Sequence, residues 1–165
     1  MFIVKDGDIF EGTEDYLCHQ ANCVSVGPAA GIAAAIYYKY PYSDIYRDRK
    51  TPNVPGHAIV CYNKGSRTIV NLLGQLYPGS SMPSSADSAE DRIVFFRKAL
   101  WDMVKQLGPG SYAFPWRVGC GIAGGDWGIY ITILKNFEAF MNKTYTKGDV
   151  IIYRLPETRP VSETE

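Results

Sequence analysis

The chain has 165 residues, a length typical of one domain, and 46% of them are hydrophobic, which is enough to build a buried core. Basic and acidic side chains number 17 each. This balance argues against nucleic acid or an anionic membrane as partner. Phosphates on a ligand would therefore have to be held by backbone N–H groups and helix ends.

The four cysteines are Cys18, Cys23, Cys61 and Cys120, and none of them forms a CxxC pair. We therefore expect no zinc cluster and no disulfide framework, but reduced thiols in a cytoplasmic protein. The start, MFIVKDGDIF, reaches charged residues after a short apolar stretch, which is unlike a signal peptide. No apolar run approaches about 18 residues, so we expect no membrane span.

The first half of the chain predicts strands around one helix. Strands are expected over residues 2–4, 16–20, 58–62 and 68–73, and the last two form a hairpin. An alanine-rich helix is expected over residues 30–39, closed by Pro41. A short helical turn is expected over residues 44–49.

The second half predicts two longer helices. After a Ser/Pro loop, hydrophobic residues recur every three or four positions from Ile93 to Leu107 and indicate a helix with one buried face. Glycine and proline at residues 108–110 end it. A strand over 112–115, a glycine-rich loop over 119–125, a helix over 127–141 and a strand over 150–153 follow.

Strands and helices alternate along most of the chain, which predicts a mixed or mostly parallel sheet between helices. We expect a single domain over residues 1–156 and a flexible tail over 157–165. In such sheets ligands bind beyond the carboxyl ends of the strands, where loops lead into helices.

Two loops have the composition of phosphate-binding segments. Residues 22–32 leave a strand and enter the alanine-rich helix, and residues 119–127 contain four glycines before the next helix. Small residues let the backbone approach a ligand, and a helix start offers unpaired N–H donors. One such loop alone often only caps a helix, but two in one small domain favour a diphosphate held between two backbone cradles.

The sequence resembles the macrodomain family from Phe2 to about Leu155. The resemblance rests on four segments in order: Gly7-Asp8-Ile9, His19-Gln20-Ala21-Asn22-Cys23, Ala30-Gly31-Ile32-Ala33, and Gly119-Cys120-Gly121 with Gly125-Asp126-Trp127. It is strongest to the branch that hydrolyses ADP-ribose 1″-phosphate. It implies a three-layer α/β/α fold with a mixed central sheet, and ADP-ribose or a phosphorylated derivative as ligand.

The resemblance also implies residue roles. Asp8 would accept a hydrogen bond from the adenine amino group, and Asn22 would contact the distal ribose. Tyr153 would border the adenine, although a core aromatic is an equal alternative. The implied ligand-binding residues are Gly7, Asp8, Ile9, Asn22, Val26, Gly27, Ala29, Ala30, Gly31, Ile32, Gln75, Pro115, Arg117, Val118, Gly119, Cys120, Gly121, Ile122, Ala123 and Tyr153.

Two departures from the family pattern affect these expectations. The first loop is one residue longer than usual and contains Pro28, which has no N–H to donate. Gln75 stands where the branch that removes ADP-ribose from glutamate side chains has a lysine. A mechanism through a lysine adduct is therefore disfavoured.

His19 and Asp126 are the expected catalytic pair, with Asn22 beside them. Phosphate-ester hydrolysis needs a positioned water and a proton donor, and histidine titrates near neutrality. We expect Asp126 to orient the water and His19 to meet the phosphate, or the reverse. The alternatives are a buried structural histidine and an aspartate that caps the following helix.

The remaining reactive side chains have simpler interpretations. His57 is expected to be structural or exposed, and Cys23 and Cys120 to be small buried thiols. Arg117 could meet phosphate or lie on the surface.

Three functions follow from these expectations: a phosphatase acting on ADP-ribose 1″-phosphate, an ADP-ribosyl hydrolase acting on a modified protein or nucleic acid, and a non-catalytic ADP-ribose binder. None of them needs a cofactor or a metal. We expect a monomer, located in the cytoplasm, or in the host cytoplasm if a phage encodes it.

Overall fold

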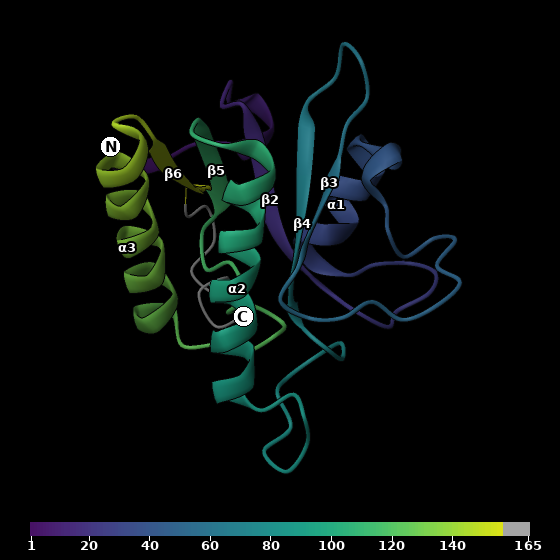
Figure 1. Cartoon of the computed structure of the whole chain (residues 1–165). Helices are drawn as coiled ribbons and strands as arrows, with labels where there is room; N and C mark the ends of the chain where they lie inside the picture. The colour runs from purple at the N-terminus through teal and green to yellow at the C-terminus, as the bar shows by residue number, and fades with distance from the viewer. Residues whose placement is uncertain (157–165) are drawn as a thin grey trace.

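A computed structural model of the chain describes residues 1–156, and the expected tail lies outside them. The strands are β1 (Phe2–Asp6), β2 (Tyr16–Asn22), β3 (Ala58–Cys61), β4 (Thr68–Gln75), β5 (Ser111–Pro115) and β6 (Asp149–Arg154). The helices are α1 (Gly31–Lys39), α2 (Ala89–Leu107) and α3 (Trp127–Tyr145), with short 3₁₀ helices η1 (Ile9–Glu11) and η2 (Pro41–Ser43) (Figure 1).

The strands form one six-stranded sheet in the order β1-β6-β5-β2-β4-β3. All neighbours pair in parallel except β3 and β4, which form the expected antiparallel hairpin. The sheet is therefore mixed, as the sequence predicts. Because β2, β4, β5 and β6 run in the same direction, their carboxyl ends meet at one edge.

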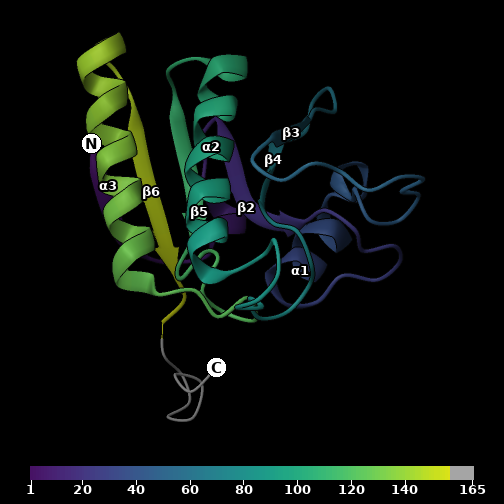
Figure 2. The ribbon, with the colours of Figure 1, turned by 60° about the horizontal axis from the view of Figure 1, so that its bottom comes forward.

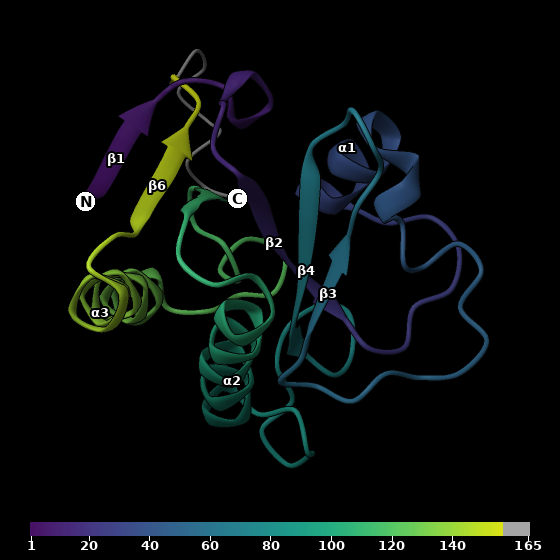
Figure 3. The same ribbon diagram turned by 45° about the horizontal axis from the view of Figure 1, so that its top comes forward.

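Helices cover both faces of this sheet: α2 and α3 pack on one face and α1 on the other (Figure 3). Successive residues of β2 show the division. Leu17 belongs to the core that contains Ile36 of α1, whereas Cys18 belongs to the core that contains Phe96 and Leu100 of α2. The alternation follows from the two-residue period of a strand. The expected three-layer α/β/α fold is confirmed.

The expected helical turn over residues 44–49 is wrong. The short helix is η2, which ends before Asp44. The carboxylate of Asp44 then accepts hydrogen bonds from the backbone N–H groups of Tyr46 and Arg47, at 2.9 and 3.1 Å. A side chain that takes these donors offers the backbone an alternative to a helix.

The two long helices begin at side-chain caps. At α2, the hydroxyl of Ser88 accepts from the N–H of Asp91 while the Asp91 carboxylate accepts from the N–H of Ser88. This capping box starts the helix ahead of its periodic apolar face. Helix α3 runs to Tyr145, four residues beyond the expected end, before Thr146 adopts a left-handed conformation. No helix within residues 1–156 is long and apolar enough to span a membrane.

Candidate functional site

A cleft of about 730 Å³ opens where the carboxyl ends of β2, β4, β5 and β6 meet. Asn22, Gln75, Pro115 and Tyr153 line it from these four strands. Figure 2 shows α1, the tip of β6 and the start of α3 together at this end of the molecule. The volume suits a ligand of nucleotide size.

One wall of the cleft is the amino-terminal end of α1. Residues 29–33 line the cleft, and the N-cap residue Ala30 has no side chain that can accept a hydrogen bond from the first turn. The first N–H groups of a helix have no acceptor within the helix, and the helix dipole adds positive potential there. The sequence therefore leaves this helix end open toward the cleft.

The facing wall is the glycine-rich loop between β5 and α3. Tight turns close it, with the N–H of Gly124 donating to the carbonyl of Gly121 at 3.0 Å and that of Gly125 to Gly119 at 3.1 Å. Gly121, Ile122 and Ala123 line the cleft, and their own N–H groups have no protein acceptor within residues 1–156. These donors are available to a ligand.

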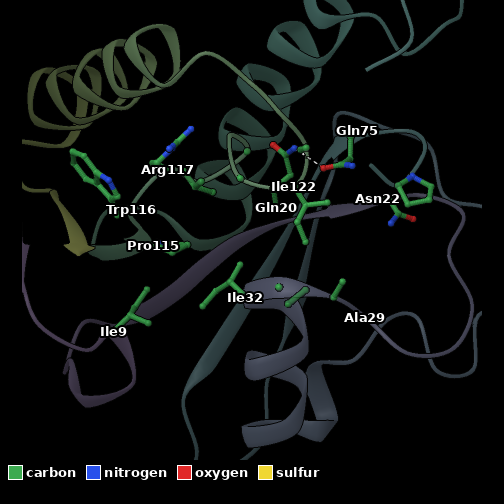
Figure 4. A pocket seen from close by; sticks show the side chains of 18 of the residues that line it. Ile9, Gln20, Asn22, Ala29, Ile32, Gln75, Pro115, Trp116, Arg117 and Ile122 are labelled. Carbon is green, nitrogen blue, oxygen red and sulfur yellow. Dashed lines mark hydrogen bonds between the residues drawn. The ribbon is translucent and has the colours of Figure 1, made fainter. Parts of the chain in front are cut away.

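The two walls lie close together. A Cβ atom added to Gly31 would lie only 3.0 Å from Cδ1 of Ile122. Figure 4 shows Ile32 of α1 and Ile122 of the glycine-rich loop on opposite sides of the same opening. The two loops that the sequence singled out therefore bound one cleft.

Few charged groups line this cleft. Among its lining residues within 1–156, Asp8 and Arg117 are the only Asp, Glu, Lys or Arg, and there is no histidine or cysteine. One carboxylate oxygen of Asp8 accepts from the N–H of Phe10 at 2.9 Å and so caps η1. A phosphate in the cleft would therefore meet mainly neutral backbone donors.

Tyr153 lies both in the core and at the cleft. Its ring lines the cleft beside Gly7 and also belongs to the core under α1. Its hydroxyl donates to Glu14 at 2.6 Å, and Glu14 pairs with Arg67 at 2.9 Å. Burial, together with the carboxylate of Glu14, raises the pKa of Tyr153 to about 12. The phenol therefore stays neutral and fixed.

Side-chain amides form the other end of the cleft. Gln20 donates to the side-chain oxygen of Gln75 at 2.7 Å (Figure 4). Gln75 in turn donates to the carbonyl of Tyr77 at 2.8 Å. The side-chain oxygen of Asn22 accepts from the N–H groups of Val24 and Ser25. These contacts fix the amides at the ends of β2 and β4.

Three of the predicted ligand-binding residues do not line the cleft. Val26 is 65% exposed outside it, and the N–H of Gly27 donates to the carbonyl of Tyr46 at 3.1 Å. Cys120 turns into the core under α2 and α3, where burial raises the pKa of its thiol to about 12. The other predicted ligand-binding residues all line the cleft.

The structure contradicts the expected role of His19. This side chain is fully buried between the sheet and α1, edge-on to Tyr37, and does not line the cleft. Its Nε2 lies 2.8 Å from the side-chain oxygen of Asn71, which also accepts from the hydroxyl of Tyr37. Burial lowers the pKa of His19 to about 4. His19 is the structural histidine of the alternative interpretation.

Asp126 also lies outside the cleft. It is the N-cap of α3, and its carboxylate accepts from the N–H of Gly128 at 2.9 Å. The capping interpretation therefore describes its contacts, and the expected catalytic pair is not assembled. His57 lies away from the cleft, with its ring 3.8 Å from Asp102. Within residues 1–156 no group of three metal-ligating side chains occurs.

Sequence reasoning missed two arginines that bind backbone carbonyls of segments beside the cleft. Arg49 donates to the carbonyls of Asn22 and Ser25, both at 2.9 Å, and so supports the first loop. Arg92 is buried at the start of α2 and binds carbonyls of two segments beside the cleft. The sequence did contain a signal for Arg92: it lies on the same face of the helix as Phe96 and Leu100, and a charged residue on a buried face is usually paired.

Solved structures of macrodomains resemble this chain over nearly its whole length. The macrodomain of Mycobacterium tuberculosis DarG is 20% identical with a TM-score of 0.66, over 95% of this chain and 99% of that one. The macrodomain of Thermus aquaticus DarG is 19% identical with a TM-score of 0.62, over 93% and 98%. A mutant Oceanobacillus iheyensis macrodomain solved with ADPR is 18% identical with a TM-score of 0.62, over 92% and 83%.

These likenesses establish the class of fold: the chain is an α/β protein with the macrodomain fold. No protein-family model matches the sequence, and no curated protein matches it.

Proposed function

We propose that this protein binds ADP-ribose, or a phosphorylated derivative of it, in the cleft between α1 and the glycine-rich loop. The observation that supports it is the pairing of an uncapped helix start with the free N–H groups of Gly121, Ile122 and Ala123. Backbone donors at a helix start suit a pyrophosphate without lysine. A solved protein of the same fold, at 18% identity, carries ADPR.

The lining fits the nucleotide in one direction. Ile9 lies at one end of the cleft and Asn22 at the other, with Ile32 and Ile122 between them (Figure 4). The apolar end, beside Asp8 and Tyr153, suits the adenine, and the free oxygen of Asp8 would accept from its amino group. The amide-lined end suits the hydroxyls of the distal ribose, which need neutral donors and acceptors.

Hydrolysis of ADP-ribose 1″-phosphate is a finer proposal, supported by the sequence likeness of the glycine-rich loop. His19 and Asp126 do not supply its chemistry, because both lie outside the cleft. Cleft residues would have to orient the water, and the amides near Asn22 are the groups within the lining that suit this task. Removal of ADP-ribose from a modified protein or nucleic acid would place the same demand on them.

Titration calorimetry with ADP-ribose tests the binding proposal, with AMP and ribose 5-phosphate as partial ligands. We expect ADP-ribose to bind more tightly than either fragment, since only the whole molecule spans both ends of the cleft. Absence of heat with ADP-ribose, or equal affinity for AMP, would overturn the proposal. Release of phosphate from ADP-ribose 1″-phosphate by the same protein separates a phosphatase from a binder.

A further inference from the structure

Arg92 connects two segments that border the cleft. It lies in the first turn of α2, is 2% exposed, and does not line the cleft. Its guanidinium donates to the carbonyls of Gly79 at 2.7 Å and Tyr77 at 3.0 Å, in the segment that follows β4. It also donates to the carbonyl of Ala123 in the glycine-rich loop, at 3.2 Å.

Asp87 completes this arrangement. It is fully buried, and its carboxylate accepts from Arg92 at 2.6 Å and from the N–H groups of Leu76 and Tyr77 at 2.8 and 3.0 Å. Burial disfavours the charged form, but the hydrogen bonds from Arg92 and from the two amides outweigh it and lower the pKa of Asp87. The ion pair therefore fixes the chain directly after β4.

A hydrophobic residue in place of Arg92 would fill the core without the cost of burying a charge. A buried ion pair gains little net stability over a packed apolar pair. What the guanidinium adds is geometry, since its planar fork can bind several carbonyls at fixed angles. The segment that contains Gly79 lines the cleft next to Gln75, and Ala123 lines it with Ile122. A Cβ atom added to Gly124 would lie 3.5 Å from the hydroxyl oxygen of Ser80, so the two segments lie close together.

We infer that Arg92 and Asp87 are positioning residues for the cleft. They hold the segment after β4 and the glycine-rich loop at a fixed separation, and thereby set the affinity for the nucleotide without contacting it. The inference rests on the proposed function for its ligand, but the fixed separation is a property of the free protein.

The test compares Arg92→Met and Arg92→Lys with a matched core variant, Met103→Ala. Met103 is fully buried on the same helix and does not line the cleft, so its truncation lowers the melting temperature without touching either segment. Arg97→Met, on the exposed side of α2, controls for loss of an arginine. Calorimetry with ADP-ribose at a temperature where all variants are folded measures affinity.

We expect Arg92→Met to weaken ADP-ribose binding by about tenfold or more, the effect of losing charge-assisted hydrogen bonds. Arg92→Lys should recover part of this loss, because one ammonium can hold only some of the carbonyls. Met103→Ala and Arg97→Met should bind as the wild type does. Should Arg92→Met fail to fold, Asp87→Asn removes the charge with little change of shape and takes its place.

Hydrogen exchange of the free protein provides the second measurement. Arg92→Met should speed exchange of the hydrogen-bonded amides of both segments together, those of Leu76 and Tyr77 and those of Cys120, Gly124 and Gly125. Met103→Ala should not speed exchange selectively at these amides. Unchanged affinity in Arg92→Met, or faster exchange in only one segment, would overturn the inference. If the wild type fails to bind ADP-ribose, the proposed function falls, and the exchange data still decide whether Arg92 joins the two segments.

Discussion

Gly31 is the residue at which the first loop becomes α1, and its backbone conformation disfavours a larger side chain. Its φ of 60° lies in the left-handed region, and a Cβ atom would press on Ile122 at 3.0 Å. We predict that Gly31→Ala weakens ADP-ribose binding by about tenfold. Both the unfavourable φ and the contact with Ile122 would displace the N–H donors at the start of α1. Calorimetry measures this effect.

A double variant separates the two causes. Gly31→Ala combined with Ile122→Ala removes the side-chain contact and retains the unfavourable φ, and its affinity is compared with that of Ile122→Ala alone because Ile122 lines the cleft. Recovery of affinity in the double variant would assign the loss to the contact, whereas no recovery would assign it to the backbone. Wild-type affinity in the single variant would contradict the prediction.

His19 gives the protein a dependence on pH that is unrelated to the cleft. Folding holds its imidazole neutral, with a pKa of about 4, because burial disfavours the charged form more than the hydrogen bonds to Asn71 and to the backbone of Gln20 favour it. The unfolded chain takes up a proton near pH 6.5. The contribution of His19 to stability is therefore complete above about pH 6.5 and is lost as pH falls toward 4.

Urea denaturation between pH 7 and pH 4 measures this loss, which we expect to reach on the order of 3 kcal/mol. His19→Gln should flatten the profile in this window, even if it lowers stability at pH 7. His57→Gln serves as the matched substitution of an exposed histidine, because the His57 side chain is 60% exposed. Equal slopes in the wild type and His19→Gln would contradict the assignment.

At the scale of elements, α3 depends on Asp126 for its start. The carboxylate caps the helix through the N–H of Gly128. We predict that Asp126→Ala costs about 1 kcal/mol of stability, as loss of an N-cap usually does. Binding of ADP-ribose and any turnover of its 1″-phosphate should stay unchanged, since Asp126 does not line the cleft.

Thermal unfolding and calorimetry on the same samples check both parts of this prediction. Asp126→Ser retains a capping oxygen and should restore most of the stability. A loss of turnover in Asp126→Ser would show a chemical role for the carboxylate beside its capping contact and would contradict the predicted unchanged turnover.

At the scale of the whole molecule, the neutral charge balance and the sparsely charged cleft predict weak dependence of binding on salt. Within residues 1–156, Asp8 and Arg117 are the only residues with charged side chains that line the cleft. Because salt screens charges but leaves backbone donors intact, the affinity for ADP-ribose should change by less than about threefold between roughly 0.05 and 0.5 M NaCl. Calorimetry across this range measures it, and a steep fall in affinity would point to a cationic site instead.

The order and type of the main elements followed from local patterns. Strand and helix periods, together with glycine and proline at residues 108–110, predicted the mixed sheet, the β3–β4 hairpin and the three α-helices. These signals are local, since they depend on side chains that are neighbours along the chain. The single helical turn predicted at residues 44–49 failed because one carboxylate captured the backbone donors that a helix needs.

By itself, the sequence determined the layers, the two small-residue loops and the neutrality of the molecule. Only the tertiary structure decided that His19 faces α1 whereas its neighbour Gln20 faces the cleft, because a strand alternates sides and packing selects which side is buried. It likewise decided that Arg49 and Arg92 hold carbonyls distant in the chain. Such contacts join residues that become neighbours only when the sheet and helices assemble, so no local pattern encodes them.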